Sequence, residues 1–173
     1  MSTPIGAPAK SATPSIKLRN LNDWCDVALV NVDVVDWIEF GSTEPKIGKD
    51  GKPRTQDRIT AIVIAGNAVI TDNDADVPVK ADDVISIYCA GHRRWEYILA
   101  VKARGQLMRG DVMRVKYTHD EASATKGNNA KKVWSFQIRA AKPDEATRTA
   151  RCEEIARGGA TPIGGAESFD EPF

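Results

Sequence analysis

Hydrophobic and polar residues alternate along the middle of the chain, and this period of two predicts β-strands. The first clear alternation, with Val30, Val32 and Val34 on one side, predicts a half-buried strand that ends near Phe40. Further segments with strand-like patterns follow at 58–71, 83–89, 111–118 and 132–140. We therefore expect most of the regular structure to be β.

One segment has a helical pattern instead. Trp95, Ile98, Leu99 and Lys102 fall on one face of a helix, and Gly105 supplies a stop signal. The apolar rhythm from Val84 onward also fits one longer helix that is interrupted near residue 91. We favour a strand followed by a helix.

Segments rich in glycine, proline and polar residues separate these elements. Residues 41–56 form a basic loop, 72–76 an acidic turn and 119–131 a polar loop. The prolines of residues 1–15 predict a disordered N-terminal arm, and the glycines after residue 157 predict a flexible linker. Residues 142–156 have helical propensity but few apolar residues to hold a helix. We therefore expect one folded domain over 16–141 and a flexible acidic tail over 142–173.

The order of the elements indicates a fold class. Several strands, a helix and two further strands are typical of the oligonucleotide/oligosaccharide-binding (OB) barrel, which has five strands. Its helix lies between strands three and four. The predicted fold is therefore mainly β, an OB-like barrel with one helix and disordered tails at both ends. A generic antiparallel sandwich with one incidental helix is the alternative.

Composition excludes several classes of protein. No stretch approaches the roughly 20 apolar residues of a membrane span, and the N-terminal residues lack the apolar run of a secretory signal. The three cysteines are widely separated, which excludes a disulfide framework or a Cys-x-x-Cys metal site and is typical of the cytoplasm. With two histidines and no catalytic motif, we expect a protein without enzymatic activity, metal or cofactor, and without a membrane partner.

The formal charge of zero conceals an uneven distribution. Residues 17–90 carry a net charge of −5, residues 91–139 a net charge of +7 and residues 144–173 a net charge of −4. A basic segment followed by an acidic tail indicates binding to a polyanion, with a tail that competes for the same surface. The alternative is charge drift over a solvated surface.

Basic and aromatic residues alternate on the last two predicted strands, and single-stranded nucleic acid needs both. Cations neutralise phosphates, and flat rings stack on bases. The alternative for each ring is a place in the core, and Trp134 shares its face with Phe136 and Ile138, which indicates burial. The candidate nucleic-acid-binding residues are Trp37, Phe40, Lys52, Arg54, Arg58, Arg93, Arg94, Trp95, Arg114, Lys116, Tyr117, Lys131, Lys132, Trp134 and Arg139.

The C-terminus carries a resemblance to a known family. The chain ends in Asp170, Glu171, Pro172 and Phe173 after a glycine-rich linker. In this it resembles bacterial single-stranded DNA-binding proteins, which place an acidic tip ending in Pro-Phe after an OB domain and a linker. The resemblance implies that Phe173 docks on replication and recombination proteins, while Asp170 and Glu171 pair with basic residues around the pocket. Residues 105–132 also look like small OB-type replication proteins of bacteriophages, which implies a host cytoplasm.

These observations lead to one hypothesis and two rivals. The leading hypothesis is a non-enzymatic single-stranded DNA-binding protein of replication, recombination or repair, with little sequence preference and a tip that recruits partners. The first rival is a bacteriophage structural or assembly adaptor built on a β-barrel. The second is an enzyme such as a nuclease accessory, which lacks a convincing acidic metal cluster. The sequence leaves homo-oligomerisation and the preference for DNA over RNA open.

Overall fold

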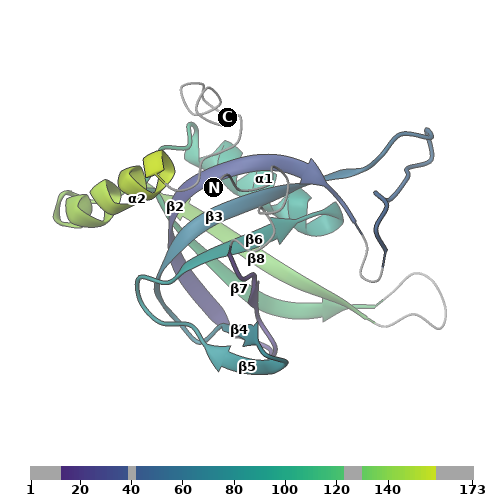
Figure 1. Ribbon diagram of the computed structural model, residues 1–173, viewed down its shortest axis with the longest axis horizontal. Helices are drawn as coiled ribbons and strands as arrows, with labels where there is room; N and C mark the ends of the chain where they lie inside the picture. The colour runs from purple at the N-terminus through teal and green to yellow at the C-terminus, as the bar shows by residue number, and fades with distance from the viewer. Residues whose placement is uncertain (1–12, 39–41, 123–129, 159–173) are drawn as a thin grey trace, which may run out of the picture.

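The computed structural model describes residues 13–38, 42–122 and 130–158, and within them the protein is mainly β (Figure 1). One antiparallel sheet has the order β6-β3-β2-β7-β8, and a smaller one has the order β1-β4-β5. The strands of the larger sheet are β2 (Trp24–Asp36), β3 (Thr55–Gly66), β6 (Val84–Cys89), β7 (Val112–Glu121) and β8 (Lys131–Arg139). Those of the smaller sheet are β1 (Ile16–Lys17), β4 (Val69–Asp72) and β5 (Ala75–Pro78). The helical elements are α1 (Gly91–Arg104), the 3₁₀ turn η2 (Pro143–Glu145) and α2 (Ala146–Gly158).

The larger sheet buries apolar side chains on both of its faces. One face of β2, with Cys25, Val27 and Leu29, contributes to the main core together with α1. The opposite face, with Ala28 and Val30, packs against α2 in a second cluster. Because β2 is covered on both sides, residues 27–30 are all buried and lose the strict alternation of a half-exposed strand.

Gly66 allows the end of β3 to approach the start of β2. A Cβ atom at this position would lie 2.5 Å from the carbonyl oxygen of Trp24 and 2.7 Å from the Cα of Cys25. Gly66 also has a φ of +146°, which side-chain-bearing residues rarely adopt. The close approach continues the pairing of β2 with β3 as far as Cys25 and Gly66.

Helix α1 forms where the sequence predicts it, and its inward face is centred on two residues of the middle of the helix. Its buried residues are Tyr97 and Ala100, whereas Trp95 is 57% and Leu99 43% exposed. Arg93 and Arg104 complete the inward stripe at its two ends, because residues 93, 97, 100 and 104 share one side of a helix. Arg104 forms an ion pair with the buried Asp111 at 3.0 Å. The face that the sequence pattern assigns to Trp95, Ile98, Leu99 and Lys102 is therefore largely exposed.

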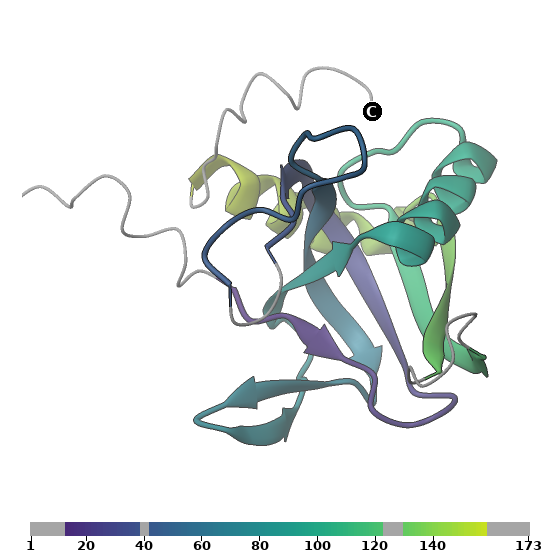
Figure 2. The same ribbon diagram turned by 90° about the vertical axis from the view of Figure 1, so that its right-hand side faces the viewer.

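The segment before β2 belongs to the folded body from Thr13 onward. The amide of Ser86 in β6 donates to the carbonyl of Pro14 at 2.9 Å, and Ile16 and Leu18 are buried in the main core. The segment lies beside β6 (Figure 2), joined to it by a parallel bridge between Ser15 and Ser86, and its residues 15–19 line a pocket together with Tyr88 of β6 and Trp134 of β8. Residues 13–15 thus depart from the predicted disordered arm, while residues 1–12 lie outside the described residues.

The first part of the predicted flexible tail is a helix. α2 covers the outer face of β2 (Figure 1), and its Cys152 is fully buried against Ala28, Val30 and Ile62. A few apolar side chains suffice because β2 and β3 present an apolar surface to them. The folded body therefore extends to Gly158 instead of ending at residue 141, and residues 159–173 lie outside the described residues.

The mainly β prediction is confirmed, but its details need correction. The predicted barrel has five strands and one helix, whereas the described residues form two sheets and two α-helices, and the larger sheet does not close. The predicted helix–strand order around α1 and the acidic hairpin turn of Asn73 and Asp74 between β4 and β5 are present. Among the described helices, none has the length and apolar character that crossing a membrane requires.

Candidate nucleic-acid interface

The connection between β2 and β3 folds back on itself into an arm, here residues 37–38 and 42–54. The amide of Trp37 donates to the carbonyl of Arg54 (2.9 Å), that of Lys46 to Trp37 (2.8 Å) and that of Arg54 to Lys46 (2.6 Å). At the tip, the amide of Gly51 donates to the carbonyl of Gly48 at 3.0 Å. The backbone thus brings one tryptophan and two cations together although they are far apart in the sequence.

Trp37 lies beside these two cations. The Nζ of Lys46 is 4.3 Å and the guanidinium carbon of Arg54 5.4 Å from the ring centroid. Both lie within the roughly 6 Å over which a ring face attracts a cation. Trp37 stays half-exposed, so part of the ring remains accessible to a ligand.

Helix α1 directs its N-terminus toward the arm. Its first turn holds no acidic residue, and no side chain caps it. The first amide groups of a helix lack partners within the helix and carry a partial positive charge. The start of α1, at Gly91, therefore adds positive potential to that of the arm.

Arg94 extends from this first turn to β3. Its Nη1 donates to the carbonyl oxygen and to the Oγ1 of Thr55, both at 3.3 Å, and its Nε donates to Oδ2 of Asp57 at 3.1 Å. Burial raises the pKa of Asp57, and the nearby Arg94 opposes that shift. These contacts fix the start of α1 against β3, so Arg94 is a positioned donor whose charge is balanced.

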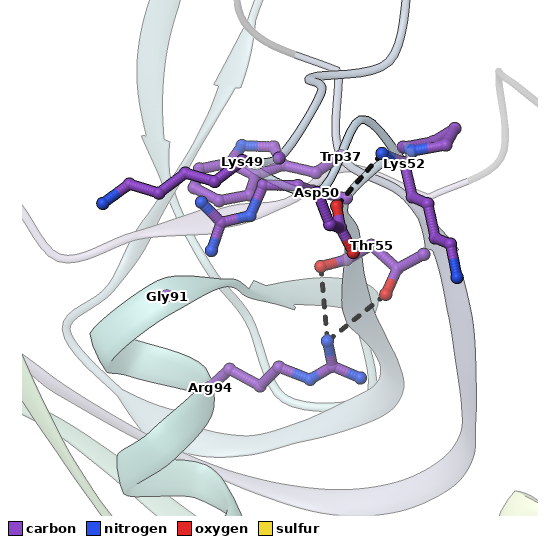
Figure 3. Close-up of a pocket in the computed structure, with 10 residues that line it drawn as sticks. Trp37, Lys49, Asp50, Lys52, Thr55, Gly91 and Arg94 are labelled. Carbon is purple, nitrogen blue, oxygen red and sulfur yellow. Dashed lines mark hydrogen bonds between the residues drawn. The ribbon is translucent and has the colours of Figure 1, made fainter.

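The arm and the helix start enclose a cleft of about 790 Å³. Figure 3 shows Trp37, Lys49 and Asp50 of the arm on one side, with Gly91 and Arg94 of α1 on the other. Four cationic side chains and one carboxylate contribute to the lining, so its surface is positive. The residues around the cleft are Trp37, Gly48, Lys49, Asp50, Lys52, Pro53, Arg54, Thr55, Gly91 and Arg94.

Three cations of the cleft are not ion-paired, in contrast to most of the arginines in the described part of the chain. Among the residues that the structure describes, Lys49, Lys52 and Arg54 have no carboxylate within ion-pair distance. By contrast, Arg114 pairs with Asp26 at 2.7 Å, and Arg139 pairs with Glu145 at 2.7 Å. The arm therefore presents three cations that no carboxylate of the described residues neutralises.

Two of the aromatic residues predicted to stack on bases lie in the core. Tyr117 and Trp134 are each 5% exposed, and both belong to the main hydrophobic cluster. Lys132 lies over the ring of Tyr117 (5.2 Å) and Arg93 over that of Trp134 (3.6 Å). Because a base needs an open ring face, the stacking role predicted for these two residues is wrong. The predicted burial of the face shared by Trp134, Phe136 and Ile138 is consistent with their positions.

The remaining candidates do not converge on one surface. Arg58 of β3 pairs with Asp33 of β2 at 2.6 Å, and Trp95 is exposed on α1 outside the cleft. Arg114 and Arg139 line a separate pocket of about 300 Å³, and Arg93, Lys132 and Trp134 line another of about 240 Å³. Lys116 is half-buried on β7, and Lys131 is exposed at the start of β8. Phe40 and the tip residues Asp170, Glu171, Pro172 and Phe173 lie outside the described residues.

Trp37, Lys52, Arg54 and Arg94 are the sequence-predicted candidates that the structure brings to the cleft. Sequence reasoning did not select Lys49, Thr55 or Gly91 as binding residues. The signal for Lys49 was present, because the loop over 41–56 is basic and rich in glycine. The positions of Thr55 and Gly91 carry no such signal, since they depend on how α1 packs against β3.

Comparison of the chain with models of known protein families, with curated proteins and with solved structures finds no match.

Proposed function

We propose that this protein binds single-stranded DNA without enzymatic activity, through the cleft between the arm and α1. The observation that carries the proposal is the combination of a half-exposed Trp37 with three cations that lack a carboxylate partner among the described residues. Lys49, Lys52 and Arg54 would neutralise phosphates and release counterions. Trp37 would stack on a base, a contact worth about 1–3 kcal/mol whatever the base.

The order of the elements supports the same proposal at the level of the fold. An OB barrel binds oligonucleotides on its second and third strands and on the loops between strands one and two and between strands four and five. If β2, β3, β6, β7 and β8 are taken as the five OB strands, α1 occupies the position between the third and fourth. The arm is then the loop between the first and second strands. We propose an opened OB-type sheet on this basis.

The proposal keeps the role of the C-terminal tip. Its support is the sequence Asp170-Glu171-Pro172-Phe173 and the resemblance to bacterial single-stranded DNA-binding proteins. An aromatic anchor at the end of a short segment loses little conformational entropy on binding, because few residues become ordered. In this proposal the tip recruits replication and recombination proteins in the cytoplasm, including a host cytoplasm if a bacteriophage encodes the protein. Deleting residues 167–173 should leave DNA affinity unchanged or higher.

A fluorescence titration with poly(dT) tests the binding site. Trp37 and Trp95 are both accessible, but only Trp37 lines the cleft. We expect poly(dT) to quench the wild type and Trp95→Phe, and to quench Trp37→Phe much less. Equal quenching of both variants would place the strand elsewhere, and no binding at low salt would refute the proposal. Replacing poly(dT) by poly(rU) in the same titration measures the preference for DNA over RNA.

A second candidate function is that of an adaptor in a virion or in its assembly. The exposed Trp95 and Leu99 lie one helical turn apart on α1 and favour contact with another protein. Stable self-assembly together with purification free of nucleic acid would favour this role.

A further inference from the structure

A second, smaller pocket lies on the other side of the first turn of α1. Its volume is about 240 Å³, and it is lined by Arg93, by Tyr88 of β6, by Lys132 and Trp134 of β8 and by residues 15–19 of the N-terminal segment. Arg93 lines this pocket, whereas Gly91 and Arg94 of the same helical turn line the cleft, so the two cavities share one turn of α1.

Arg93 is a half-buried cation that lacks a counter-ion. Its guanidinium carbon lies 3.6 Å from the centroid of the Trp134 ring, and its Nη1 donates to the carbonyl of Tyr88 at 3.5 Å. No carboxylate of the described residues lies within 4.0 Å of it, in contrast to Arg94 and Arg104 on the same helix. Burial lowers the pKa of Arg93, which shows that its environment disfavours the charge.

A second group at this pocket also lacks a partner. The Nε1 of Trp134 is buried and has no hydrogen-bond acceptor among the described residues. A buried donor without an acceptor and a half-buried cation without a counter-ion are both energetically unfavourable. Lys17 and Lys132 add further positive charge to the same region. An anion with several oxygen atoms would supply the counter-ion that Arg93 lacks.

We propose that this pocket binds a phosphate group of the same single strand that the cleft holds. The inference rests on the proposed function. A phosphate offers oxygens to the planar guanidinium of Arg93 and charge to the two lysines. The pocket has space for roughly eight water molecules, which is enough for a phosphate and part of its hydration. The strand would therefore pass from the cleft around the first turn of α1.

Inorganic phosphate tests the pocket without any nucleic acid. At roughly five times its Kd, phosphate should raise the Tm of the wild type by about 2–4 °C relative to chloride at equal ionic strength. Arg93→Gln should lose this increase, whereas Lys80→Ala, an equal loss of charge on an exposed loop, should keep it. In the absence of phosphate, Arg93→Gln should be as stable as the wild type or more so. An equal effect of phosphate on all three proteins would refute the proposal that this pocket binds phosphate.

Oligonucleotides of two lengths test the source of the phosphate. With oligo(dT) of about 6 and about 16 nucleotides, the wild type should gain affinity with length. Arg93→Gln should bind the long oligonucleotide about 10-fold more weakly than the wild type and show a smaller deficit with the short one. If both oligonucleotides bind the wild type and the variant equally, the path around α1 is wrong while the proposed function stands. If phosphate stabilises only the wild type but no oligonucleotide binds, the proposed function fails and the pocket takes its phosphate from another source.

Discussion

The salt dependence of DNA binding gives a quantitative test of the cleft. We consider replacing Lys49, Lys52 and Arg54 by alanine, one at a time and together. These side chains line the cleft and have no carboxylate within ion-pair distance among the described residues. Each is therefore available to replace a counterion on a phosphate.

The expected magnitude follows from the number of phosphates that are neutralised. For single strands, the slope of log K against log salt changes by about 0.7 for each phosphate contact. Three contacts give the wild type a contribution of about −2, so its affinity should fall roughly 15–20-fold between about 50 mM and 200 mM salt. Each single variant should reduce the steepness of the slope by about 0.7, and the triple variant by about 2.

The assay is fluorescence anisotropy of labelled oligo(dT) at several salt concentrations. Lys80→Ala is the matched control, because it removes one exposed cation outside the cleft. Arg54→Lys keeps the positive charge but replaces the guanidinium that lies beside Trp37, so this variant should retain the wild-type slope. The reasoning is refuted if the triple variant has the same slope as the wild type, or if Lys80→Ala flattens it as much as Lys52→Ala does.

Further predictions concern stability and reactivity. Gly66→Ala should lower the free energy of unfolding by about 3 kcal/mol or more in urea, because the new methyl group meets backbone atoms of β2. Gly51→Ala, also at positive φ but in open space, should cost only about 1–2 kcal/mol, and equal losses would contradict the contact. Arg139 and neighbouring donors lower the pKa of Glu145 from 4.5 to about 2, so this carboxylate stabilises the fold above pH 4.5 and the contribution disappears as the pH falls to about 2. The difference in Tm between the wild type and Glu145→Gln should therefore shrink over that range, and a constant difference would argue against the pairing. Burial raises the pKa of Cys25 and Cys89 to about 12 and that of Cys152 to about 11. Iodoacetamide at pH 8 should therefore alkylate these thiols only after denaturation, which mass spectrometry can check. Rapid labelling of the native protein would show that the thiols are accessible.

The alternation of apolar residues was enough to locate the strands of the larger sheet, because it reports which side of a strand is buried, but it did not indicate the short β1 and β5. It does not show which face of α1 is buried, because the inward stripe begins with Arg93 and ends with Arg104. An arginine that stacks on a core ring or pairs with a buried carboxylate behaves as part of the core, and hydrophobicity does not show this. The same limit applies to α2, whose packing depends on the apolar outer face of β2.

The candidate site shows why charge along the sequence is an incomplete guide. The segment over 91–139 is the most basic part of the chain, yet Arg94, Arg114 and Arg139 are paired with acids from other segments. These pairs depend on sheet register and on helix packing, which charge counts do not contain. The arm, inside a segment of net negative charge, holds three cations that have no such partner among the described residues.

The segment from Thr13 to Leu18 has a consequence for the behaviour of shortened chains. It contacts Ser86 of β6 and contributes Ile16 and Leu18 to the core. A chain that starts at Asn20 would expose the outer edge of β6 along with the apolar surface that Ile16 and Leu18 cover. An exposed edge of this kind recruits a strand from a neighbouring molecule. Trimming the N-terminus should therefore make the protein exchange strands or precipitate, although every residue that lines the cleft is still present.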